Sequence, residues 1–263
     1  MKTKLNKMIR LYCSQKLSLN KTIVLRKNDT HYLKNVMRCK ENDQINLFNE
    51  NDKEFFSKIL KIQKDETTLK IFEPSKNTEI LNDIFLIFSL VKKNKIDFIV
   101  QKATELGVKK IFPILTERSS IRDINMNRMY AIVREASEQS NRISIPEISD
   151  LQTMQALLKK WDKNRSILYA DEILKINKNL TILNKKNFVK SSLLIGPEGG
   201  FSMKENEMLK TFKFVFPISF GKTILRSDTA AIVGLSYLNI INSSYKINSV
   251  SYTHLRAHET SPH

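Results

Sequence analysis

The sequence predicts an α/β protein in two parts, a small β-rich domain over residues 1–72 and a larger α/β domain over residues 73–248. Three observations predict this organisation. The first part holds short segments in which polar and apolar residues alternate. The second alternates continuous apolar strands with amphipathic helices, as expected of a mainly parallel sheet covered by helices. Between them, EPSKNTEI (residues 73–80) carries the Pro, Ser and Asn residues typical of a linker.

In the first part, alternation with a period of two predicts strands at 22–26, 44–49, 54–63 and 67–72. One helix interrupts these strands in DTHYLKNVMR (residues 29–38), and Asp29 or Thr30 can cap it. The apolar residues that share one face of this helix are Leu33, Val36 and Met37. The first part is therefore a β-rich domain with one helix.

In the second part, apolar runs predict strands at 84–90, 109–115, 166–170, 191–196 and 214–218. Helical spacing of apolar residues predicts helices within 95–107, 127–142 and 227–241. Gly107 stands where a C′ glycine ends the first of these helices. A further helix is expected after Ser202, because Ser202 and Glu205 have the spacing of a capping box.

The charge of the chain makes a polyanion the first partner to consider. The sequence has 44 Lys and Arg against 27 Asp and Glu, a formal net charge of +17. Residues 1–72 alone hold 16 Lys and Arg against 8 Asp and Glu, so the charge is denser at the N-terminal end. A coding composition skewed toward lysine would raise the charge without any nucleic acid, and this alternative stays open.

The location of the protein is predicted from what the sequence lacks. No apolar run approaches the roughly 20 residues that cross a bilayer, and the N-terminus lacks the apolar region of a signal peptide. We therefore expect a cytosolic protein without a membrane segment. Cys13 and Cys39 are expected to be reduced and structural, because two thiols with one nearby histidine cannot make a zinc site.

The last stretch, residues 249–263, looks foreign to the rest of the chain. It resembles translated sequencing-adapter sequence, and we exclude it from the prediction of the fold as a non-native tail. A metal-binding histidine tail is the alternative. The tail contains His254, His258 and His263, so only His31 is left for chemistry. A Ser-His-Asp or Cys-His mechanism therefore has almost no histidine to use.

Glycine is concentrated in one loop. The chain has 6 glycines, and Gly196, Gly199 and Gly200 lie in LLIGPEGGFS, directly after a predicted strand. Ligands bind at the carboxyl ends of strands in open α/β sheets, which makes this a candidate ligand loop. The sequence GPEGG matches neither standard nucleotide-binding motif, and Pro197 removes a backbone donor. A tight turn that needs glycine is the structural alternative.

A second glycine-bearing loop follows the next predicted strand. In FGKTILRSDTAA (residues 220–231), the loop contains Gly221 and ends at Arg226, just before a helix capped by Ser227. Two such loops after two neighbouring strands can hold one ligand from both sides. Arg226 at the mouth suits an anionic group or a developing negative charge, although a surface ion pair with Asp228 or Glu198 is the alternative.

These two motifs, LLIGPEGGFS and FGKTILRSDTAA, resemble those of the RsmE family of the SPOUT superfamily, which methylates N3 of a uridine in 16S ribosomal RNA. Upstream segments at 92–119 and 134–148 are similar to other motifs of the family, and residues 31–49 are similar to its PUA-like RNA-binding domain. The resemblance spans about residues 10–245. One departure is Asp228, where the family more often has glutamate.

The resemblance implies a PUA-like domain followed by a SPOUT α/β methyltransferase domain with a C-terminal trefoil knot. It also implies a homodimer that uses S-adenosyl-L-methionine and no metal. The substrate is then 16S ribosomal RNA or the assembled small subunit. The implied cofactor-binding residues are Ile195, Gly196, Pro197, Glu198, Gly199, Gly200, Phe220, Gly221, Ile224, Leu225 and Arg226.

The same resemblance suggests how the reaction is catalysed. Uracil N3 must lose a proton, and Arg226 is expected to stabilise the resulting negative charge on the base oxygens. Glu198, Asp228 or water can accept the proton, and the choice stays open. The residues expected to contact RNA are Arg38, Arg118, Arg134 and Arg142. An alternative is that several of these side chains order the site or form solvated faces. This alternative applies to Arg118, Arg134 and Arg142, and also to Glu105.

Three other functions remain as alternatives. An RNA-binding protein without activity would explain the charge but would not require glycines on two sheet-edge loops. A dinucleotide-dependent enzyme should carry G-x-G-x-x-G near the start of the domain, and none is present. A related SPOUT enzyme would methylate a ribose 2′-hydroxyl or another base.

Overall fold

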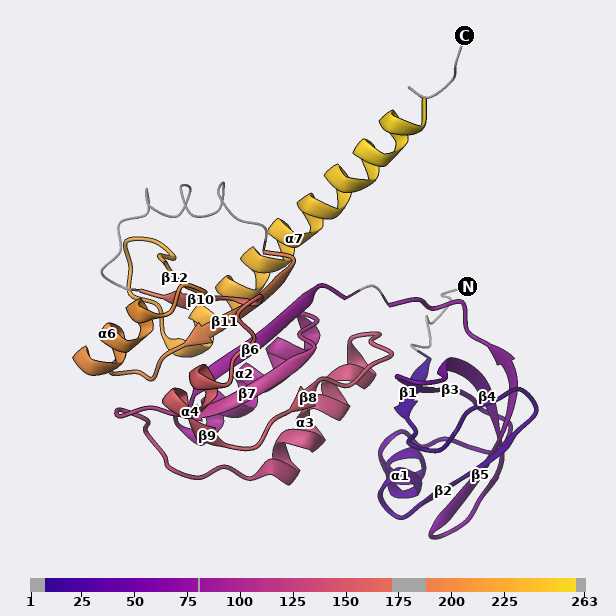
Figure 1. Cartoon of the computed structure of the whole chain (residues 1–263). Helices are drawn as coiled ribbons and strands as arrows, with labels where there is room; N and C mark the ends of the chain where they lie inside the picture. Colours follow the sequence, from indigo (N-terminus) through magenta and orange to yellow (C-terminus); the bar gives the residue numbers. More distant parts are fainter. Residues whose placement is uncertain (1–7, 80, 172–187, 259–263) are drawn as a thin grey trace. The chain divides into compact units, whose positions relative to one another are not determined.

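The structure is a computed structural model that describes residues 8–79, 81–171 and 188–258 (Figure 1). These residues form two compact units. The first comprises residues 8–79 together with 134–145, and the second comprises residues 81–133, 146–171 and 188–258. The segment 134–145 follows the linker in sequence, and its place in the first unit was not predicted. The proposed division at residues 72 and 73 stays a prediction.

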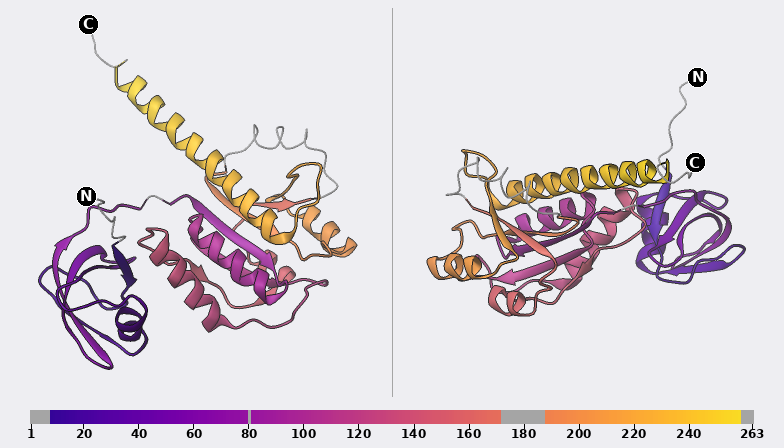
Figure 2. Two further views of the ribbon diagram at one scale, coloured as in Figure 1. Left: turned by 180° about the vertical axis from the view of Figure 1, so that it is seen from behind. Right: turned by 45° about the horizontal axis from the view of Figure 1, so that its top comes forward.

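The first unit is built on one curved five-stranded sheet (Figure 2). In spatial order its strands are β1 (Ile9–Tyr12), β3 (Gln44–Asn49), β4 (Lys53–Ile62), β5 (Glu66–Pro74) and β2 (Thr22–Arg26). β1 runs parallel to β3, and the other neighbours are antiparallel. Four of the strands match the predicted ones, and β1 was missed. Their inward-facing side chains form the core with Cys13 and Cys39, which are both free thiols.

The helix expected at 29–38 is shorter and differently capped. It consists of α1 (Asn28–His31) and a wider π-helical turn, η1 (Tyr32–Val36). Neither predicted cap was right. The hydroxyl of Thr30 donates to the carbonyl of Leu25 at 3.0 Å, and Asp29 forms an ion pair with Arg134 at 2.7 Å. The hydroxyl of Thr30 is thus taken by the preceding strand and the carboxylate of Asp29 by a distant arginine, so neither side chain caps the helix.

The predicted apolar face of this helix is also wrong. Leu33 is fully buried, whereas Val36 and Met37 are 58% and 37% exposed. The amide of Met37 donates to the carbonyl of Tyr32, five residues earlier, at 2.9 Å. A π-helical turn rotates the residues after Leu33 away from the 3.6-residue period on which the expected face depended.

The second unit is built on one parallel sheet, as predicted. Its strands lie in the order β12 (Val215–Ile218), β10 (Ser166–Ala170), β11 (Lys190–Ile195), β6 (Asp83–Ser89), β7 (Lys110–Leu115) and β8 (Glu147–Ile148), with β9 (Gln152–Thr153) also on β7. All pairs in this sheet are parallel. The two-residue strands β8 and β9 were not predicted, because two residues carry no periodicity.

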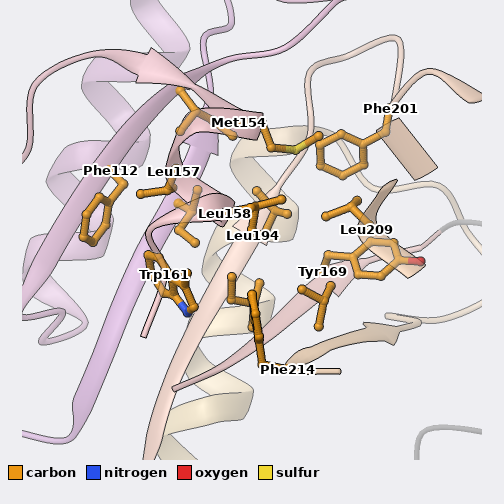
Figure 3. Close-up of a cluster of buried hydrophobic side chains, with 14 residues drawn as sticks. Phe112, Met154, Leu157, Leu158, Trp161, Tyr169, Leu194, Phe201, Leu209 and Phe214 are labelled. Carbon is orange, nitrogen blue, oxygen red and sulfur yellow. The ribbon is translucent and has the colours of Figure 1, made fainter. Parts of the chain in front are cut away.

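Helices cover both faces of this sheet. They are α2 (Lys93–Glu105), α4 (Met154–Lys159), α6 (Met203–Thr211) and α7 (Ser227–His258), whereas α3 (Met126–Gln139) begins in this unit and continues into the segment 134–145 of the first. α7 packs against α2 and across β6 and β11 (Figure 1). α4 and α6 contribute to an apolar cluster on the other face that includes Trp161, Phe201 and Tyr169 (Figure 3). α4 was missed by the sequence analysis.

The predicted helix boundaries of the second unit are confirmed where they rest on local chemistry. Gly107 has φ +82° after α2. The hydroxyl of Ser202 accepts the amide of Glu205, whose carboxylate accepts the amide of Ser202 in return, so the capping box is present. α7 is longer than expected and continues into the segment assigned to a non-native tail. Residues 259–263 of that segment lie outside the described residues.

Gly234 lets α7 approach the sheet closely. A Cβ atom on Gly234 would lie 2.6 Å from Cδ2 of Leu193 in β11 and 2.8 Å from Cζ of Phe220. These distances are below van der Waals contact, so a larger residue would force the Leu193 and Phe220 side chains, or the helix itself, to move. Leu193 lies in β11 just before the first glycine-bearing loop and Phe220 begins the second, so close packing of α7 supports both loops.

The segment 134–145 is joined to the sheet of the first unit by a buried arginine. Arg10 on β1 donates from Nε to Glu54 at 2.7 Å, from Nη1 to the carbonyl of Ser137 at 3.1 Å and from Nη2 to that of Arg142 at 2.6 Å. Arg10 and Glu54 are 7% and 2% exposed. One guanidinium thus satisfies a carbonyl group in the last turn of α3 and another just beyond the end of this helix.

Candidate functional site

The two glycine-bearing loops line one cavity of about 250 Å³ in the second unit. One loop leaves β11 and the other leaves β12, and both strands end at the same edge of the parallel sheet. The prediction that they follow neighbouring strands is wrong, because β10 lies between β11 and β12. Ala170 and Asp171, at the end of β10, therefore lie between the loops and also line the cavity.

Most of the residues predicted for the cofactor meet in this cavity. The predicted residues that line it are Ile195, Gly196, Pro197, Gly199, Gly200, Phe220, Gly221, Ile224 and Leu225. Glu198 and Arg226 are not among the lining residues. Lining residues that the sequence analysis did not assign to the cofactor include Arg118, Asp171, Phe201 and Ser219. Asp171 directly follows a predicted strand, which is the signal that could have found it.

The glycines of the loops have different structural reasons. Gly200 and Gly221 have φ of +66° and +130°, and a Cβ on either would meet no protein atom within 4 Å. The space beside these two glycines is therefore empty, and their own main-chain atoms can lie close to a bound ligand. A Cβ on Gly196 would lie 3.2 Å from the ring of Phe201, so Gly196 serves packing within the loop. The amide of Gly200 donates to the carbonyl of Pro197 at 2.9 Å and closes a turn.

A separate loop without glycine, residues 116–120 after β7, binds the first glycine-bearing loop through side-chain hydrogen bonds. Arg118 donates from Nη1 to the carbonyl of Gly199 at 2.7 Å. The hydroxyl of Ser120 donates to Glu198 at 2.7 Å, and Nζ of Lys95 lies 3.2 Å from the same carboxylate. We call these three side chains, Arg118, Ser120 and Lys95, the loop clamp.

The charge state of Glu198 fits its place in the clamp. Partial burial favours the neutral acid, but the hydrogen bond from Ser120 and the charge of Lys95 outweigh it and hold the pKa of Glu198 below its ordinary value. Glu198 is therefore an ionised anchor near neutral pH. The alternative in which Glu198 pairs with Arg226 is not observed, because the carboxylate faces Lys95.

The clamp loop is itself fixed by buried hydroxyl groups. Ser89 at the end of β6 lies 2.6 Å from the hydroxyl of Thr116 and 2.9 Å from that of Ser119. The amide of Glu117 donates to Glu205 at 2.9 Å, so the capping box of α6 also binds this loop. Arg118 and Ser120 are thus presented by a rigid support.

Arg226 lies beside the cavity rather than in its wall. Its side chain is exposed. Its carbonyl accepts a hydrogen bond of 2.8 Å from the amide of Ala230, and this bond forms part of the first turn of α7. None of the ion pairs among the described residues includes Arg226, so the expected alternative of a surface pair with Asp228 or Glu198 is absent there. Asp228 accepts the amide of Thr229 at 3.0 Å.

Beside the cavity, Tyr169 of β10 adjoins Asp171. Burial, and then the neighbouring carboxylate of Asp171, raise the pKa of Tyr169 to about 12. The phenol is thus neutral at physiological pH and belongs to the apolar cluster shown in Figure 3. In residues 8–79, 81–171 and 188–258, no three His, Cys, Asp or Glu side chains gather as they would around a metal ion.

The arginines predicted to contact RNA lie in unlike surroundings. Arg38 is exposed, with φ +54° after η1. Arg134 pairs with Asp29 at 2.7 Å and with Glu138 at 3.1 Å. Arg118 belongs to the loop clamp. Glu105, which was named beside these arginines as a residue that can order the site, forms an ion pair of 2.8 Å with Lys102 on α2.

Arg142 is the least accessible of these arginines. Its side chain is 4% exposed and lies 3.3 Å from Glu79. Burial lowers its pKa to about 10, although Glu79 opposes the shift. A guanidinium in this position is part of the interior of the first unit, and we infer a structural role for it rather than a contact with RNA.

A parallel sheet whose edge loops enclose a cavity, preceded in sequence by a small β-rich unit, defines a ligand-binding α/β class of protein, and the family comparisons identify this class as RNA methyltransferases. Family descriptions agree: an RNA methyltransferase domain matches residues 78–239, and an RNA methyltransferase PUA domain matches residues 25–72. The chain belongs to the ribosomal RNA small subunit methyltransferase E family.

Named relatives are similar over nearly the whole chain. The ribosomal RNA small subunit methyltransferase E of Rickettsia conorii is 35% identical, covering 89% of this chain and 96% of its own. That of Buchnera aphidicola is 33% identical over 88% and 95%. The crystal structure of the Neisseria gonorrhoeae enzyme bound to S-adenosyl methionine has a TM-score of 0.80 and 27% identity over 89% and 98%. The expected fold of a PUA-like domain and a SPOUT-type α/β domain is confirmed.

One further property concerns membranes. Among the helices of the described residues, none combines the length and the apolar character needed to span a bilayer.

Proposed function

We propose that this protein transfers the methyl group of S-adenosyl-L-methionine to N3 of a uridine in 16S ribosomal RNA. The observation that carries the proposal is the single cavity formed by the two glycine-bearing loops at the carboxyl edge of the parallel sheet. Family membership supports the RNA substrate, since the named relatives are small-subunit ribosomal RNA methyltransferases. The cofactor is supported by structures of similar fold from Neisseria gonorrhoeae and Legionella pneumophila with bound S-adenosyl methionine.

The residues present fit this cofactor. Ile195, Ile218 and Leu225 supply apolar walls for an adenine ring. Gly200 and Gly221 leave open space where a Cβ would otherwise stand, so their main-chain groups can reach a ligand closely. Asp171 at the end of β10 offers the cavity a carboxylate that can accept hydrogen bonds from hydroxyl or ammonium groups.

When bound, S-adenosyl-L-methionine supplies a methyl group already activated by a positively charged sulfur. The protein must then position the base and stabilise its charge. Uracil N3 loses a proton, and the negative charge spreads onto O2 and O4. Arg226 is exposed beside the cavity and has no carboxylate partner among the described residues, so its guanidinium is free to donate to these oxygens.

No residue is assigned as the base that takes the N3 proton. Glu198 is held by Ser120 and Lys95, and this position makes it an anchor of the loop rather than a proton acceptor. Asp228 lies two residues beyond Arg226 on α7 and accepts a local amide. We assign the loop clamp a positioning role, because it fixes the main chain of Gly199 in the wall of the cavity.

The remaining features of the proposal rest on the family resemblance. They are a trefoil knot in the C-terminal part, a homodimer, and work in the cytoplasm on 16S ribosomal RNA or the assembled small subunit. Arg38 and Arg118 are exposed and suit contacts with RNA phosphate. Arg134 is half-buried between two carboxylates, which favours a structural role like that of Arg142.

Incubation of the purified protein with labelled S-adenosyl-L-methionine tests the proposal. Naked 16S ribosomal RNA and assembled small subunits, both from cells lacking this modification, serve as parallel substrates. Mass spectrometry of nuclease digests should find the methyl group on N3 of one uridine. A methyl group on a ribose 2′-hydroxyl or on another base would instead place the activity with a related SPOUT enzyme, which is the alternative function.

A further inference from the structure

One face of the sheet in the first unit points away from its core. Side chains alternate along a strand, so Phe56 and Lys58 of β4 face opposite to the buried Ser57 and Ile59. One end of this outer face, which carries Arg10 and Glu54, is covered by the segment 134–145 through the hydrogen bonds of Arg10. The other end stays open.

The open end presents two aromatic rings. Phe56 on β4 and Phe72 on β5 lie with ring centroids 6.3 Å apart and planes inclined by 25°. Phe72 is 40% exposed, and Phe56 is half-buried. Exposed rings of this kind offer flat apolar surfaces on which an unstacked base can lie, and stacking on aromatic side chains is the usual way that proteins bind single-stranded RNA.

Two lysines lie beside the rings on the same face. Lys58 of β4 and Lys70 of β5 are direct cross-strand partners in the register. Like charges placed opposite each other destabilise a sheet, and none of the ion pairs found among residues 8–79 includes either lysine. An anion between the two ammonium groups would relieve this repulsion.

Polar residues extend the row across the sheet. Gln44 of β3 pairs with Lys58, and Thr22 of β2 pairs with Lys70. Both are exposed and can exchange hydrogen bonds with sugar or phosphate oxygens. Rings that suit bases therefore adjoin a row of cations and polar groups that suits a sugar-phosphate backbone.

We propose that this strip, Phe56, Phe72, Lys58 and Lys70 on β4 and β5, binds a single-stranded segment of the RNA substrate. A base stacks on Phe72 and the two lysines neutralise flanking phosphates. The inference rests on the proposed function for the identity of the RNA and adds where the first unit contacts it.

Equilibrium binding of the full chain to a fluorescently labelled transcript of small-subunit ribosomal RNA tests the strip. Lys58→Ala combined with Lys70→Ala should weaken binding and reduce the slope of log affinity against log salt by about 1.4, since each phosphate contact to a single strand contributes about 0.7. The matched control is Lys16→Ala combined with Lys40→Ala, two exposed lysines of the same unit outside β4 and β5.

Substitution of the exposed ring separates stacking from charge. Phe72→Ala should weaken binding roughly tenfold without changing the salt slope, because a stacked base interacts through its ring. Leu19→Ala, which removes another exposed apolar side chain of this unit, is its control. Glu73→Lys, at the exposed end of β5, should strengthen binding and steepen the slope.

The proposal is overturned if Phe72→Ala binds within twofold of wild type, or if both lysine pairs change the slope equally. It is also overturned if Phe72→Ala changes the mass measured by light scattering, because the face would then join copies of the chain. Affinity for S-adenosylhomocysteine should be the same in all variants. If the wild type binds RNA through the strip but does not methylate it, the proposed function is contradicted while the proposal for the strip still holds.

Discussion

Nη1 of Arg118 donates a hydrogen bond of 2.7 Å to the carbonyl oxygen of Gly199, 81 residues further along the chain. This contact joins the loop after β7 to the loop after β11, and both residues line the same cavity. Since the neighbouring Glu198 is held by Ser120 and Lys95, the glycine-bearing loop is anchored on two consecutive residues.

Arg118→Ala should lower the affinity for S-adenosylhomocysteine about tenfold. The charged donor to Gly199 is lost, and one hydrogen bond from an exposed charged group contributes about 1.4 kcal/mol. Isothermal titration calorimetry measures the affinity. Arg128→Ala, which removes an exposed ion pair with Asp97 on α2, is the control and should bind normally. Equal affinities for both variants would show that the clamp does not position the loop.

Substitution of Gly200 should separate backbone conformation from room for the ligand. Gly200→Val should lose both stability and affinity for S-adenosylhomocysteine, because a β-branched residue is strained at φ +66°. Gly200→Asn tolerates that conformation and should keep the thermal midpoint near that of the wild type. Its side chain should nevertheless block the cofactor. If the Asn variant bound the cofactor normally, the loop would be only a turn.

Arg226→Ala should reduce the rate of methylation about a hundredfold while leaving affinity for S-adenosylhomocysteine unchanged. Removal of a charge-stabilising donor costs about 3 kcal/mol in the transition state, and Arg226 does not line the cavity. Single-turnover kinetics measure the rate. Arg226→Lys should recover little, because an ammonium group cannot make the two-point contact of a guanidinium. A near-normal rate for the Ala variant would remove Arg226 from the mechanism.

Glu54 should make the first unit sensitive to acid. Burial favours its neutral form, but hydrogen bonds from Arg10, Asn46 and Asn77 outweigh burial and hold its pKa below the ordinary 4.5. A depressed carboxyl pKa stabilises the fold above the unfolded pKa, and this stability is lost as pH falls through the folded value.

Glu54→Gln should therefore destabilise the protein at pH 7, by about 3 kcal/mol, since Arg10 is left without its buried partner. The difference from wild type should narrow between pH 5 and pH 3. Thermal unfolding at several pH values, followed by circular dichroism, measures both effects. Glu50→Gln, at an exposed site after β3, is the control. A constant difference across this pH range would contradict the role given to the Glu54 carboxylate.

Much of the fold and site followed from local patterns. The alternation of apolar strands and amphipathic helices predicted the parallel sheet, and Ser202 with Glu205 predicted the start of α6. Glycines placed after strands predicted the two ligand loops, and the family resemblance supplied the predicted cofactor residues, nine of which line the cavity. These features depend on neighbours a few residues apart, whose interactions the sequence itself specifies.

Other features depended on partners far along the chain. β1 was missed because the charged Arg10 is a residue type typical of the protein surface. In the structure, the carboxylate of Glu54, 44 residues away, neutralises Arg10 in the interior. The prediction that Asp29 caps the helix at 29–38 was wrong for a similar reason, since Asp29 pairs with Arg134 rather than with a nearby amide. Arg142 was expected to contact RNA, but its side chain is buried beside Glu79 inside the first unit.

The sequence by itself determined the class of fold, the two glycine-bearing loops and the family, because each is written in short-range periodicity or in contiguous motifs. Only the tertiary structure decided that β10 separates the loops, that Arg118 binds Gly199 and that Glu198 anchors the loop instead of pairing with Arg226. The physical reason is that the order of strands in a sheet sets which distant side chains meet, and local propensity does not encode that order.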